Sequence, residues 1–218
     1  MESEVKIAFS SKEQLFSIVE EEWFKDYCLD TSPKMSVNLD NTYYDTEDLK
    51  LSSRGASIRV RKYETEDGDR YEHTVKFGGG VVNGLHQRYE WNVDSDKKEF
   101  DLQLFIRKAC QSDDPIELLT GALEGITEAD IKPLCRTVFE RTTYTFGFGD
   151  SMMEACFDYG RIKAGDKEET ICELEIELES GDVVDLKEMA QYIVDNSEGV
   201  PFDESKFKRC LKLLNADE

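Results

Sequence analysis

The segment ICELEIELES, residues 171–180, decides the fold of this chain. Glu173, Glu175 and Glu177 alternate in it with aliphatic residues at positions 174, 176 and 178. Successive side chains of a β-strand point to opposite faces, so the three carboxylates emerge on one side and the aliphatic groups on the other. The segment therefore predicts a strand with one acidic face and one aliphatic face.

The same sorting of side chains begins at the N-terminus, where Glu2, Glu4 and Lys6 alternate with Val5 and Ile7. It continues in further segments, at residues 34–44, 56–63, 70–77, 85–93, 134–148 and 152–160. About eight strands, mostly antiparallel and each with one charged face, predict an α+β fold: a closed eight-stranded antiparallel β-barrel, or tunnel. Closure would give this tunnel a charged lumen and turn the aliphatic faces outward, against helices packed outside.

The apolar residues of the remaining segments recur at helical spacing. These segments are residues 11–27, with Ser10 or Ser11 as N-cap, 97–125, 185–196 and 201–214. Thr127 and Asp130 form the pattern of a capping box. We therefore expect a single domain over residues 1–218, with a helical insertion at about 97–133 that covers one side of the sheet.

Three segments are typical of loops between strands. Residues 64–69 and 161–169 are polar and predict hairpin loops. The run Gly78–Gly80 also predicts a loop, because glycine runs are typical of turns. It does not form a phosphate-binding P-loop, since no Gly-Lys-Ser/Thr sequence and helix follow it.

Charge and composition limit the partners of the chain. The net charge of −21 disfavours nucleic acid and anionic membrane surfaces. No apolar run approaches the roughly 20 residues that cross a bilayer, and the acidic N-terminus lacks a signal-peptide core. We expect a cytoplasmic monomer or homodimer with a small anionic substrate, whose charge a local cationic cluster and bound metal would offset.

Cysteine and histidine supply little chemistry. The six cysteines lie far apart, which disfavours zinc binding, and most of them are typical of reduced core thiols; they are Cys28, Cys110, Cys135, Cys156, Cys172 and Cys210. Only two histidines are present, which disfavours catalysis led by histidine. His73 shares an apolar face and is expected to be packed, whereas His86 receives no role.

The residues expected to face the lumen divide by charge. The acidic group comprises Glu2, Glu4, Glu90, Asp158, Glu173, Glu175 and Glu177, and the basic group comprises Lys6, Arg59, Arg61, Lys76, Arg88, Arg141 and Lys206. A single pair of this kind is typical of a solvated sheet face, but burying the whole set without a ligand would be very unfavourable. Clustered carboxylates suit Mg²⁺ or Mn²⁺, and Arg and Lys suit phosphate oxygens. The two groups together favour metal-assisted hydrolysis of a phosphoanhydride.

An ordered series of motifs carries a family resemblance. Glu2-x-Glu4-x-Lys6 resembles the N-terminal E-x-E-x-K signature of the CYTH superfamily, the triphosphate tunnel metalloenzymes. Further blocks resemble that family along the whole chain: Tyr43-Tyr44-Asp45-Thr46 with Leu49 and Gly55, Arg59-x-Arg61, Thr74-Val75-Lys76, Arg88-Tyr89-Glu90-Trp91, Phe139-x-Arg141, Phe157-Asp158-Tyr159-Gly160, Glu173-x-Glu175-x-Glu177 with Gly181, and Ser205-Lys206. The E-x-E-x-K motif alone is a weak signal, and the ordered series is a strong one.

The resemblance implies an eight-stranded tunnel that binds a triphosphate compound with Mg²⁺ or Mn²⁺, two ions being expected. It implies that the substrate is held by Lys6, Arg59, Arg61, Lys76, Arg88, Arg141 and Lys206. It implies that metal is held by Glu2, Glu4, Glu90, Asp158, Glu173 and Glu175. The residues expected to take part in catalysis are Glu4, Lys6, Lys76 and Glu175. Glu177 and Arg136 receive no role, and Arg136 falls on the opposite parity from Arg141.

These expectations favour a hydrolase that converts inorganic triphosphate to diphosphate and phosphate. The alternatives within the family are a nucleoside- or thiamine-triphosphatase and a class IV adenylate cyclase. A different class is a polyphosphate-binding module without catalysis. A lipocalin-like barrel for an organic ligand is disfavoured, since such barrels line their lumen with apolar residues.

The aromatic residues near these motifs are expected to pack outward. Trp91, Tyr89, Phe139 and Phe157 are more typical of packing against helices than of a base-stacking platform.

Overall fold

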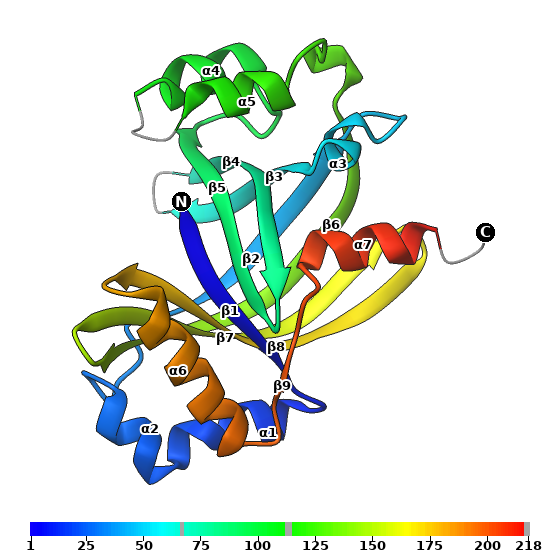
Figure 1. The fold of residues 1–218 in the computed structure, drawn as a ribbon. Coiled ribbons are helices and arrows are strands. Elements are labelled where there is room, and N and C mark those ends of the chain that lie inside the picture. Colours follow the sequence, from blue (N-terminus) through cyan, green and yellow to red (C-terminus); the bar gives the residue numbers. More distant parts are fainter. Residues whose placement is uncertain (66–67, 112–114, 216–218) are drawn as a thin grey trace.

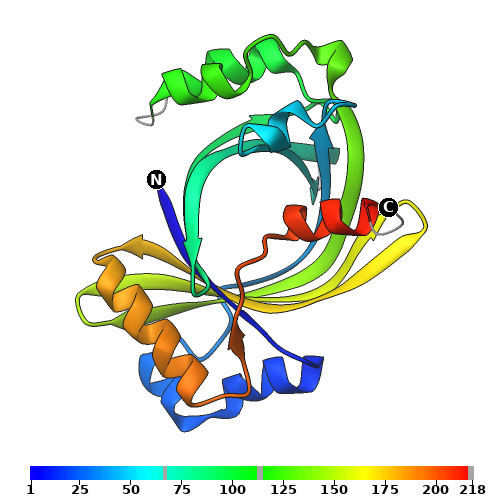
Figure 2. The same ribbon diagram turned by 45° about the vertical axis from the view of Figure 1, so that its right-hand side comes forward.

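In the computed structural model, which describes residues 1–65, 68–111 and 115–215, eight long strands form a closed antiparallel ring. The strand order is β5-β4-β3-β2-β6-β7-β8-β1, and β1 pairs again with β5 to close the ring (Figures 1 and 2). The strands are β1 (Glu2–Ala8), β2 (Met35–Asp45), β3 (Ala56–Thr65), β4 (Gly68–Val82), β5 (Leu85–Ser95), β6 (Lys132–Phe148), β7 (Ser151–Ala164) and β8 (Lys167–Ser180), with a two-residue strand β9 (Val200–Pro201) beside β1. The predicted fold class is confirmed.

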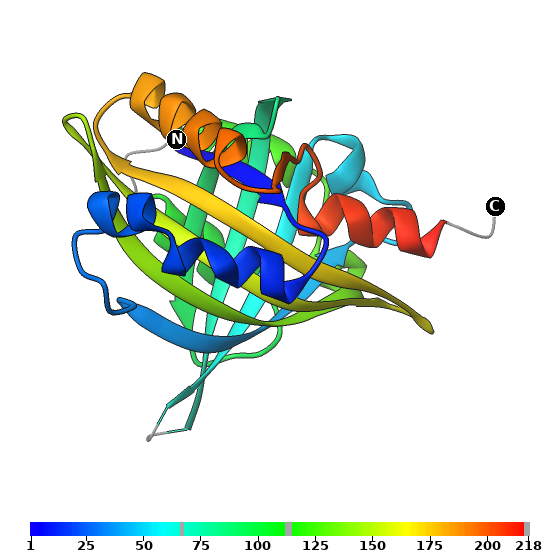
Figure 3. The ribbon, with the colours of Figure 1, turned by 90° about the horizontal axis from the view of Figure 1, so that it is seen from below.

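The helices pack outside the ring. They are α1 (Lys12–Ser17), α2 (Glu22–Tyr27), α3 (Lys50–Ser53), α4 (Leu102–Ala109), α5 (Ile116–Ala122), α6 (Val183–Asp195) and α7 (Lys206–Leu214), with 3-10 turns η1 (Ile18–Glu20) and η2 (Glu128–Asp130). Figure 3 shows α1, α2 and α6 laid across the outer side of the lower strands, and Figure 1 shows α4 and α5 above the upper ones. In Figure 2, α7 lies at one end of the ring.

Three apolar cores hold these helices against the barrel, and the smallest of them includes Phe207 and Cys210 of α7. Leu15, Phe24 and Phe157 belong to the core beneath β6, β7, β8 and β1, while Trp91 and Phe105 belong to the core between the upper strands and α4 and α5. Burying one such side chain contributes about 1.5–3 kcal/mol. Because the apolar faces of the strands pack into these outer cores, the charged faces point into the interior of the barrel.

Several predicted boundaries were wrong in detail. The predicted helix 11–27 is broken, because Glu21 is extended (φ −67°, ψ 143°) and separates η1 from α2. The predicted loop 161–169 is mostly strand, and only residues 165–166 lie between β7 and β8. The predicted helix 201–214 begins only at Lys206, where Ser205 is its N-cap. Residues 66–67 of the predicted loop 64–69, and residues 112–114 of the insertion, lie outside the described residues.

The glycine run Gly78–Gly80 is not a hairpin loop. It lies inside β4, where the pairing with β5 shifts register between Phe77 and Gly80, and the turn itself is at Asn83 and Gly84. Gly79 has φ +98°, and a Cβ there would lie 1.9 Å from the carbonyl oxygen of Gln87. The run therefore makes a β-bulge that only glycine accommodates.

Other local predictions are confirmed. Ser11 caps α1 by accepting from Gln14 N, and Thr127 and Asp130 form a capping box at η2. His73 is buried, and its Nε2 lies 2.8 Å from the carbonyl oxygen of Lys97. No helix in the described ranges has the length and apolar character needed to span a membrane.

The expectation that most cysteines are reduced core thiols is met by three of the six, Cys28, Cys156 and Cys172, which are free and buried. Cys135 in β6 and Cys210 in α7 form a disulfide, and Cys110 is exposed. Sequence spacing alone could not reveal this bridge, because closure of the barrel brings together residues that lie 75 positions apart. The bridge ties α7 to the end of the barrel.

Removal of this bridge has a predictable effect on stability. Cys210→Ser should lower the free energy of unfolding by about 2–5 kcal/mol, because the disulfide restricts a long loop in the unfolded chain. Urea unfolding of the oxidised protein measures the change, and Cys110→Ser serves as the matched control with no effect. Identical unfolding of the wild type with and without a thiol reductant would contradict the prediction.

Candidate active site

Strand register places opposite charges side by side around the lumen. Residues directly opposite on neighbouring antiparallel strands share a face. The registers pair Glu2 with Arg88, Lys6 with Glu175, Lys76 with Glu90, and Arg141 with Asp158. The side chains that alternation placed on one face are therefore interleaved by charge when the ring closes.

These side chains surround a cavity of about 110 Å³ inside the ring. All seven predicted phosphate-binding cations line it: Lys6, Arg59, Arg61, Lys76, Arg88, Arg141 and Lys206. The carboxylates that line it are Glu2, Glu4, Glu90, Glu175 and Glu177. The structure thus brings together most of the predicted site residues.

One wall of the cavity is centred on Glu4 and Glu175. Lys6 Nζ lies 3.2 Å from Glu4 Oε1 and donates to Glu175 Oε1. Arg141 donates to Glu175 and, at 3.2 Å, to Glu177 Oε1. Glu4, Lys6 and Glu175 are buried, so each charge is balanced by neighbours rather than by water.

The adjoining wall is centred on Glu2 and Glu90. Lys76 Nζ lies 3.0 Å from Glu2 Oε2 and also forms an ion pair with Glu90. Arg88 contacts Glu2 at 3.4 Å and donates to Glu4 on the first wall. Arg59 lies 3.7 Å from Glu90. Among the described residues Arg59 Nε is buried without a hydrogen-bond partner, so this wall has spare donor capacity for an anionic ligand.

α7 closes one end of the cavity with Lys206. Its Nζ lies 2.7 Å from Asp158 Oδ2, 2.5 Å from Glu173 Oε1 and 2.9 Å from Glu175 Oε1. Burial by itself lowers the pKa of Lys206, but Asp158, Glu173 and Glu175 outweigh burial and raise this pKa well above its usual value. Lys206 is therefore an ammonium at any working pH.

Asp158 and Glu173 lie behind the cavity lining. Both are fully buried, and their oxygens already accept from cations. Asp158 accepts from Arg141 through two bonds of 2.7 Å and from Lys206. Their predicted role as metal ligands stays a prediction, and in this structure they hold the cations of the closed end.

The carboxylates that best fit a divalent cation are Glu4, Glu175 and Glu177. One oxygen of each lies within 4.8 Å of the others, and an all-oxygen set suits Mg²⁺ or Mn²⁺. Oxygens of Asp158, Glu173 and Glu175 are equally close together. Cations contact both sets, Lys6 and Arg141 the first and Lys206 the second, but of these two sets only the first has all three carboxylates in the cavity lining. Glu177, which was expected to face the lumen without a defined role, belongs to this first set.

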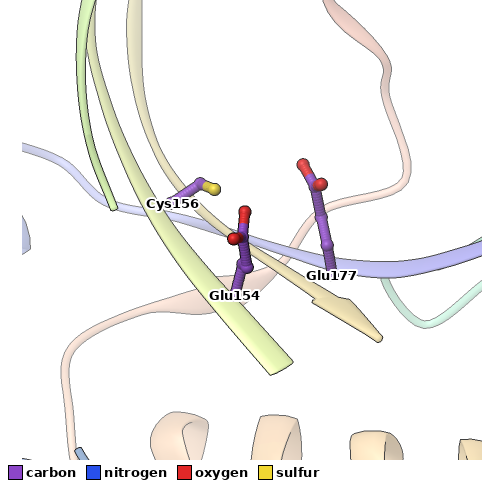
Figure 4. A group of neighbouring side chains, drawn as sticks. All are labelled: Glu154, Cys156 and Glu177. Carbon is purple, nitrogen blue, oxygen red and sulfur yellow. The ribbon is translucent and has the colours of Figure 1, made fainter. Parts of the chain in front are cut away.

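A third group combines Glu154, Cys156 and Glu177, whose side chains project from β7 and β8 (Figure 4). Burial raises the pKa of the Cys156 thiol far above its usual value, so the sulfur is protonated and a poor ligand. Glu154 forms an ion pair with Lys34. This group fits a cation less well than the all-carboxylate set.

Burial and charge move the carboxyl pKa values in opposite directions. Burial raises the pKa of Glu2 to about 7, although Lys76 opposes the change. Burial would also raise the pKa of Glu4, but Lys6 and Arg88 lower it to about 2. In the same way Lys206 and Lys6 hold the pKa of Glu175 well below its usual value, and Lys76 and Arg59 hold that of Glu90. Glu4, Glu175 and Glu90 therefore stay ionised, whereas Glu2 exchanges a proton near neutral pH.

Acid should unfold the ligand-free protein through these groups. The pKa of Glu4 is about 2 in the folded chain, whereas the ordinary pKa of a glutamate, as in the unfolded chain, is 4.5. The unfolded chain therefore binds protons first as the pH falls. The stabilisation is fully present above about pH 4.5 and is lost toward pH 2, on the order of 3 kcal/mol for Glu4 alone. Glu2 has the opposite sign, since its raised pKa favours the folded protein as the pH falls from about 7 to 4.5.

Stability should therefore be greatest near pH 5 and fall steeply below it. Urea unfolding at a series of pH values measures this profile, and Glu4→Gln should flatten its acid limb. A profile that is level between about pH 5 and pH 3 would contradict the pKa assignments.

Phe139 was expected to pack outward and instead lines the cavity with Tyr43 and Phe207. Its ring lies 4.9 Å from Lys206 Nζ, and Tyr43 stacks on Phe207 with ring centroids 5.3 Å apart. Phe139 has the same parity as Arg141, so alternation alone would have placed it correctly. The predictions for Trp91, Tyr89 and Phe157 are confirmed, since all three belong to the outer cores.

Three residues stand apart from this site or were missed. Arg136 is exposed and pairs with Asp40 outside the cavity, in agreement with its parity. Asn41 and Ser57 line the cavity without having been predicted. Ser57 shares the parity of Arg59, and Asn41 accepts from Arg61 Nε at 2.9 Å, so parity was again the available signal.

Known proteins are similar to this chain in sequence and in structure. An inorganic triphosphatase of Haemophilus influenzae is 34% identical over 148 residues, which are 68% of this chain and 38% of that protein. The chain thus matches well under half the length of this relative.

Solved structures share the fold. HpAC1 of Hippeastrum, for which a dominant triphosphatase activity is described, has a TM-score of 0.62 at 15% identity, over 100% of this chain and 97% of that one. The PH1819 protein of Pyrococcus horikoshii OT3 has a TM-score of 0.54 at 13% identity, over 96% and 98%. At these identities the similarity shows the fold alone. The CYTH domain model matches residues 1–211, and the chain belongs to the CYTH domain family.

Proposed function

We propose that this chain hydrolyses a phosphoanhydride bond of a short polyphosphate, inorganic triphosphate first, with a divalent metal ion. The observation that carries the proposal is the buried cavity in which seven cations and five carboxylates converge. The Haemophilus relative, named an inorganic triphosphatase, agrees with it.

The balance of charge supports both the substrate and the metal. Seven cations and five carboxylates line the cavity, and Asp158 and Glu173 behind the lining pair with two of these cations, Arg141 and Lys206. Because the cations are largely balanced already, the charge of a bound triphosphate would be offset by a divalent cation bound with it. Seven cations around one cavity, in a chain whose net charge is −21, favour an anionic ligand over a neutral or apolar one.

Glu4, Glu175 and Glu177 would hold the metal, with Glu2 and Glu90 offering oxygens from the adjoining wall. A bound Mg²⁺ or Mn²⁺ supplies charge neutralisation and lowers the pKa of a bound water. The binding of two metal ions stays a prediction. Asp158 and Glu173 serve in this proposal to hold Lys206 and Arg141 rather than metal.

The cations of the cavity bind and orient the substrate. Arg59, Arg61, Arg88 and Arg141 present guanidinium donors to phosphate oxygens. Lys6 is buried, and despite that burial Glu175 and Glu4 raise its pKa, so it stays an ammonium. Lys6 therefore does not accept a proton, and Lys6 and Lys76 offset the negative charge that develops on the leaving phosphate.

A substrate panel tests this function. Inorganic triphosphate, ATP, thiamine triphosphate and long-chain polyphosphate are each incubated with Mg²⁺, Mn²⁺ or a chelator, and phosphate and cyclic AMP are measured. The expected result is phosphate release from triphosphate that requires metal and exceeds release from the organic substrates. Tight binding without turnover would indicate a binding module instead, and cyclic AMP as the main product would indicate a cyclase.

Three further expectations are untested. That residues 1–218 form a single domain, that the protein works in the cytoplasm, and that it is a monomer or homodimer all stay predictions.

A further inference from the structure

Arg209 is a buried arginine of α7 that no sequence motif marked. It is 5% exposed, and it lies three residues after Lys206, on the same face of the helix. Its Nε lies 2.6 Å from Glu169 Oε1 and its Nη1 lies 2.7 Å from Glu173 Oε2. Its Nη2 donates to the carbonyl oxygen of Thr170, and the guanidinium lies 5.4 Å from the ring of Phe202. Arg209 is thus held in one position by β8 and α7 together.

Glu173 forms a bridge between two cations of α7. One of its oxygens accepts from Lys206 at 2.5 Å, and the other accepts from Arg209 at 2.7 Å. Glu173 is fully buried, so no water shares its charge. The position of the Glu173 carboxylate, and therefore of Lys206, depends on both partners.

Arg209 supplies one of the cations at the closed end. Asp158, Glu173 and Glu175 are contacted there by Lys206, Arg141 and Arg209. Glu169 also pairs with Arg209, but its side chain is partly exposed, whereas Glu173 is buried. Without Arg209, the buried Glu173 would have to share the Lys206 ammonium with Asp158 and Glu175 directly behind the cavity.

We propose that Arg209 is a positioning residue, which sets Lys206 in place through Glu173 and offsets the charge of Glu173 behind an anionic substrate. It lies behind Glu173 and does not line the described cavity, so it acts on the substrate only through its neighbours. This inference rests on the proposed function, because its first readout is the binding of triphosphate.

The test compares variants of the full chain with triphosphate and Mn²⁺. Arg209→Gln should raise KM at least about tenfold and change kcat less than about threefold, because an added charge behind the substrate weakens the ground state and the transition state alike. Arg209→Lys should fall between Arg209→Gln and the wild type, since lysine keeps the charge but lacks the planar fork. Lys212→Gln is the matched control, because Lys212 lies on the same helix, is exposed and pairs with Glu204.

A double variant separates positioning from simple structural support. Because Arg209 acts on the substrate through Glu173, adding Arg209→Gln to Glu173→Gln should leave KM within about threefold of the value for Glu173→Gln alone. A purely structural role would lower the melting temperature of Arg209→Gln without moving KM. If KM does not move in Arg209→Gln, or if the two changes raise KM multiplicatively, the inference is overturned. Where Arg209→Gln does not fold, Arg209→Lys and the double variant carry the same comparison.

Failure of the proposed function would be distinguishable. If the wild type releases no phosphate from triphosphate with any metal, the hydrolase proposal fails, and the inference is then tested by binding. The rise in melting temperature that triphosphate and Mn²⁺ cause should shrink in Arg209→Gln, and it should be no smaller in the double variant than in Glu173→Gln alone. An equal rise in Arg209→Gln and the wild type, or no rise in the wild type, would overturn the inference.

Discussion

Glu4→Gln should reduce metal-dependent phosphate release by about 10³-fold, or about 4 kcal/mol of transition-state stabilisation. Glu4 is 2% exposed and contributes one of the three clustered carboxylate oxygens that fit a divalent cation. Glutamine keeps the volume of the side chain but removes its charge and one of the acceptor oxygens. The metal would then be held by fewer ligands, beside Lys6 and Arg88, whose charges would no longer be balanced by Glu4.

The measurement is phosphate release from inorganic triphosphate over a range of Mg²⁺ and Mn²⁺ concentrations. Circular dichroism and the melting temperature show whether the variant is folded. Glu188→Gln is the matched control, because Glu188 is exposed on α6 outside the barrel. Turnover by folded Glu4→Gln at the rate of this control would count decisively against the proposed site.

Lys206→Met should lower both stability and activity. The ammonium lies between three buried carboxylates, Asp158, Glu173 and Glu175. Removing one partner of a buried ionic group leaves uncompensated charge and costs about 3–5 kcal/mol. Loss of one cation that holds the substrate should reduce turnover by about 10²-fold.

The same variant should respond to metal more than the wild type. Once the ammonium is gone, the three carboxylate oxygens, which lie within 4.8 Å of one another, form an oxygen site for Mn²⁺. The rise in melting temperature on adding Mn²⁺ should therefore be larger for Lys206→Met than for the wild type. Lys212→Met on the same helix is the control, and an equal rise in all three proteins would contradict the prediction.

Most of the residues predicted for the site line one cavity, because side-chain parity is a local property. A residue such as Arg59 or Glu175 faces the lumen according to its place in the alternation, and no other part of the chain is needed to see it. Phe139 shares the parity of Arg141, so the prediction that it packs outward conflicted with the alternation of its own strand. The Gly78–Gly80 run was misplaced because a bulge and a turn use the same residue type, and only the partner strand distinguishes them.

The parts that could not be predicted depend on contacts between distant segments. The break at Glu21 follows from the need of both Leu15 and Phe24 to enter one core under the barrel. In the sequence, Arg209 belongs to an ordinary amphipathic helix. The pattern of that helix does not indicate that Glu169 and Glu173 of β8 are the partners of Arg209. Glu177 became a candidate ligand only when the β1–β8 register placed it opposite Glu4.

By itself the sequence determined which side chains face inward, the closed barrel that this sorting requires, and the family to which the motifs belong. Tertiary structure alone decided which cation lies beside which carboxylate, how α7 is held at the end of the barrel, and that Cys135 reaches Cys210. The reason is physical. Alternation is imposed by the covalent geometry of each strand, whereas strand register and barrel closure are set by the combined packing of residues that are far apart in the chain.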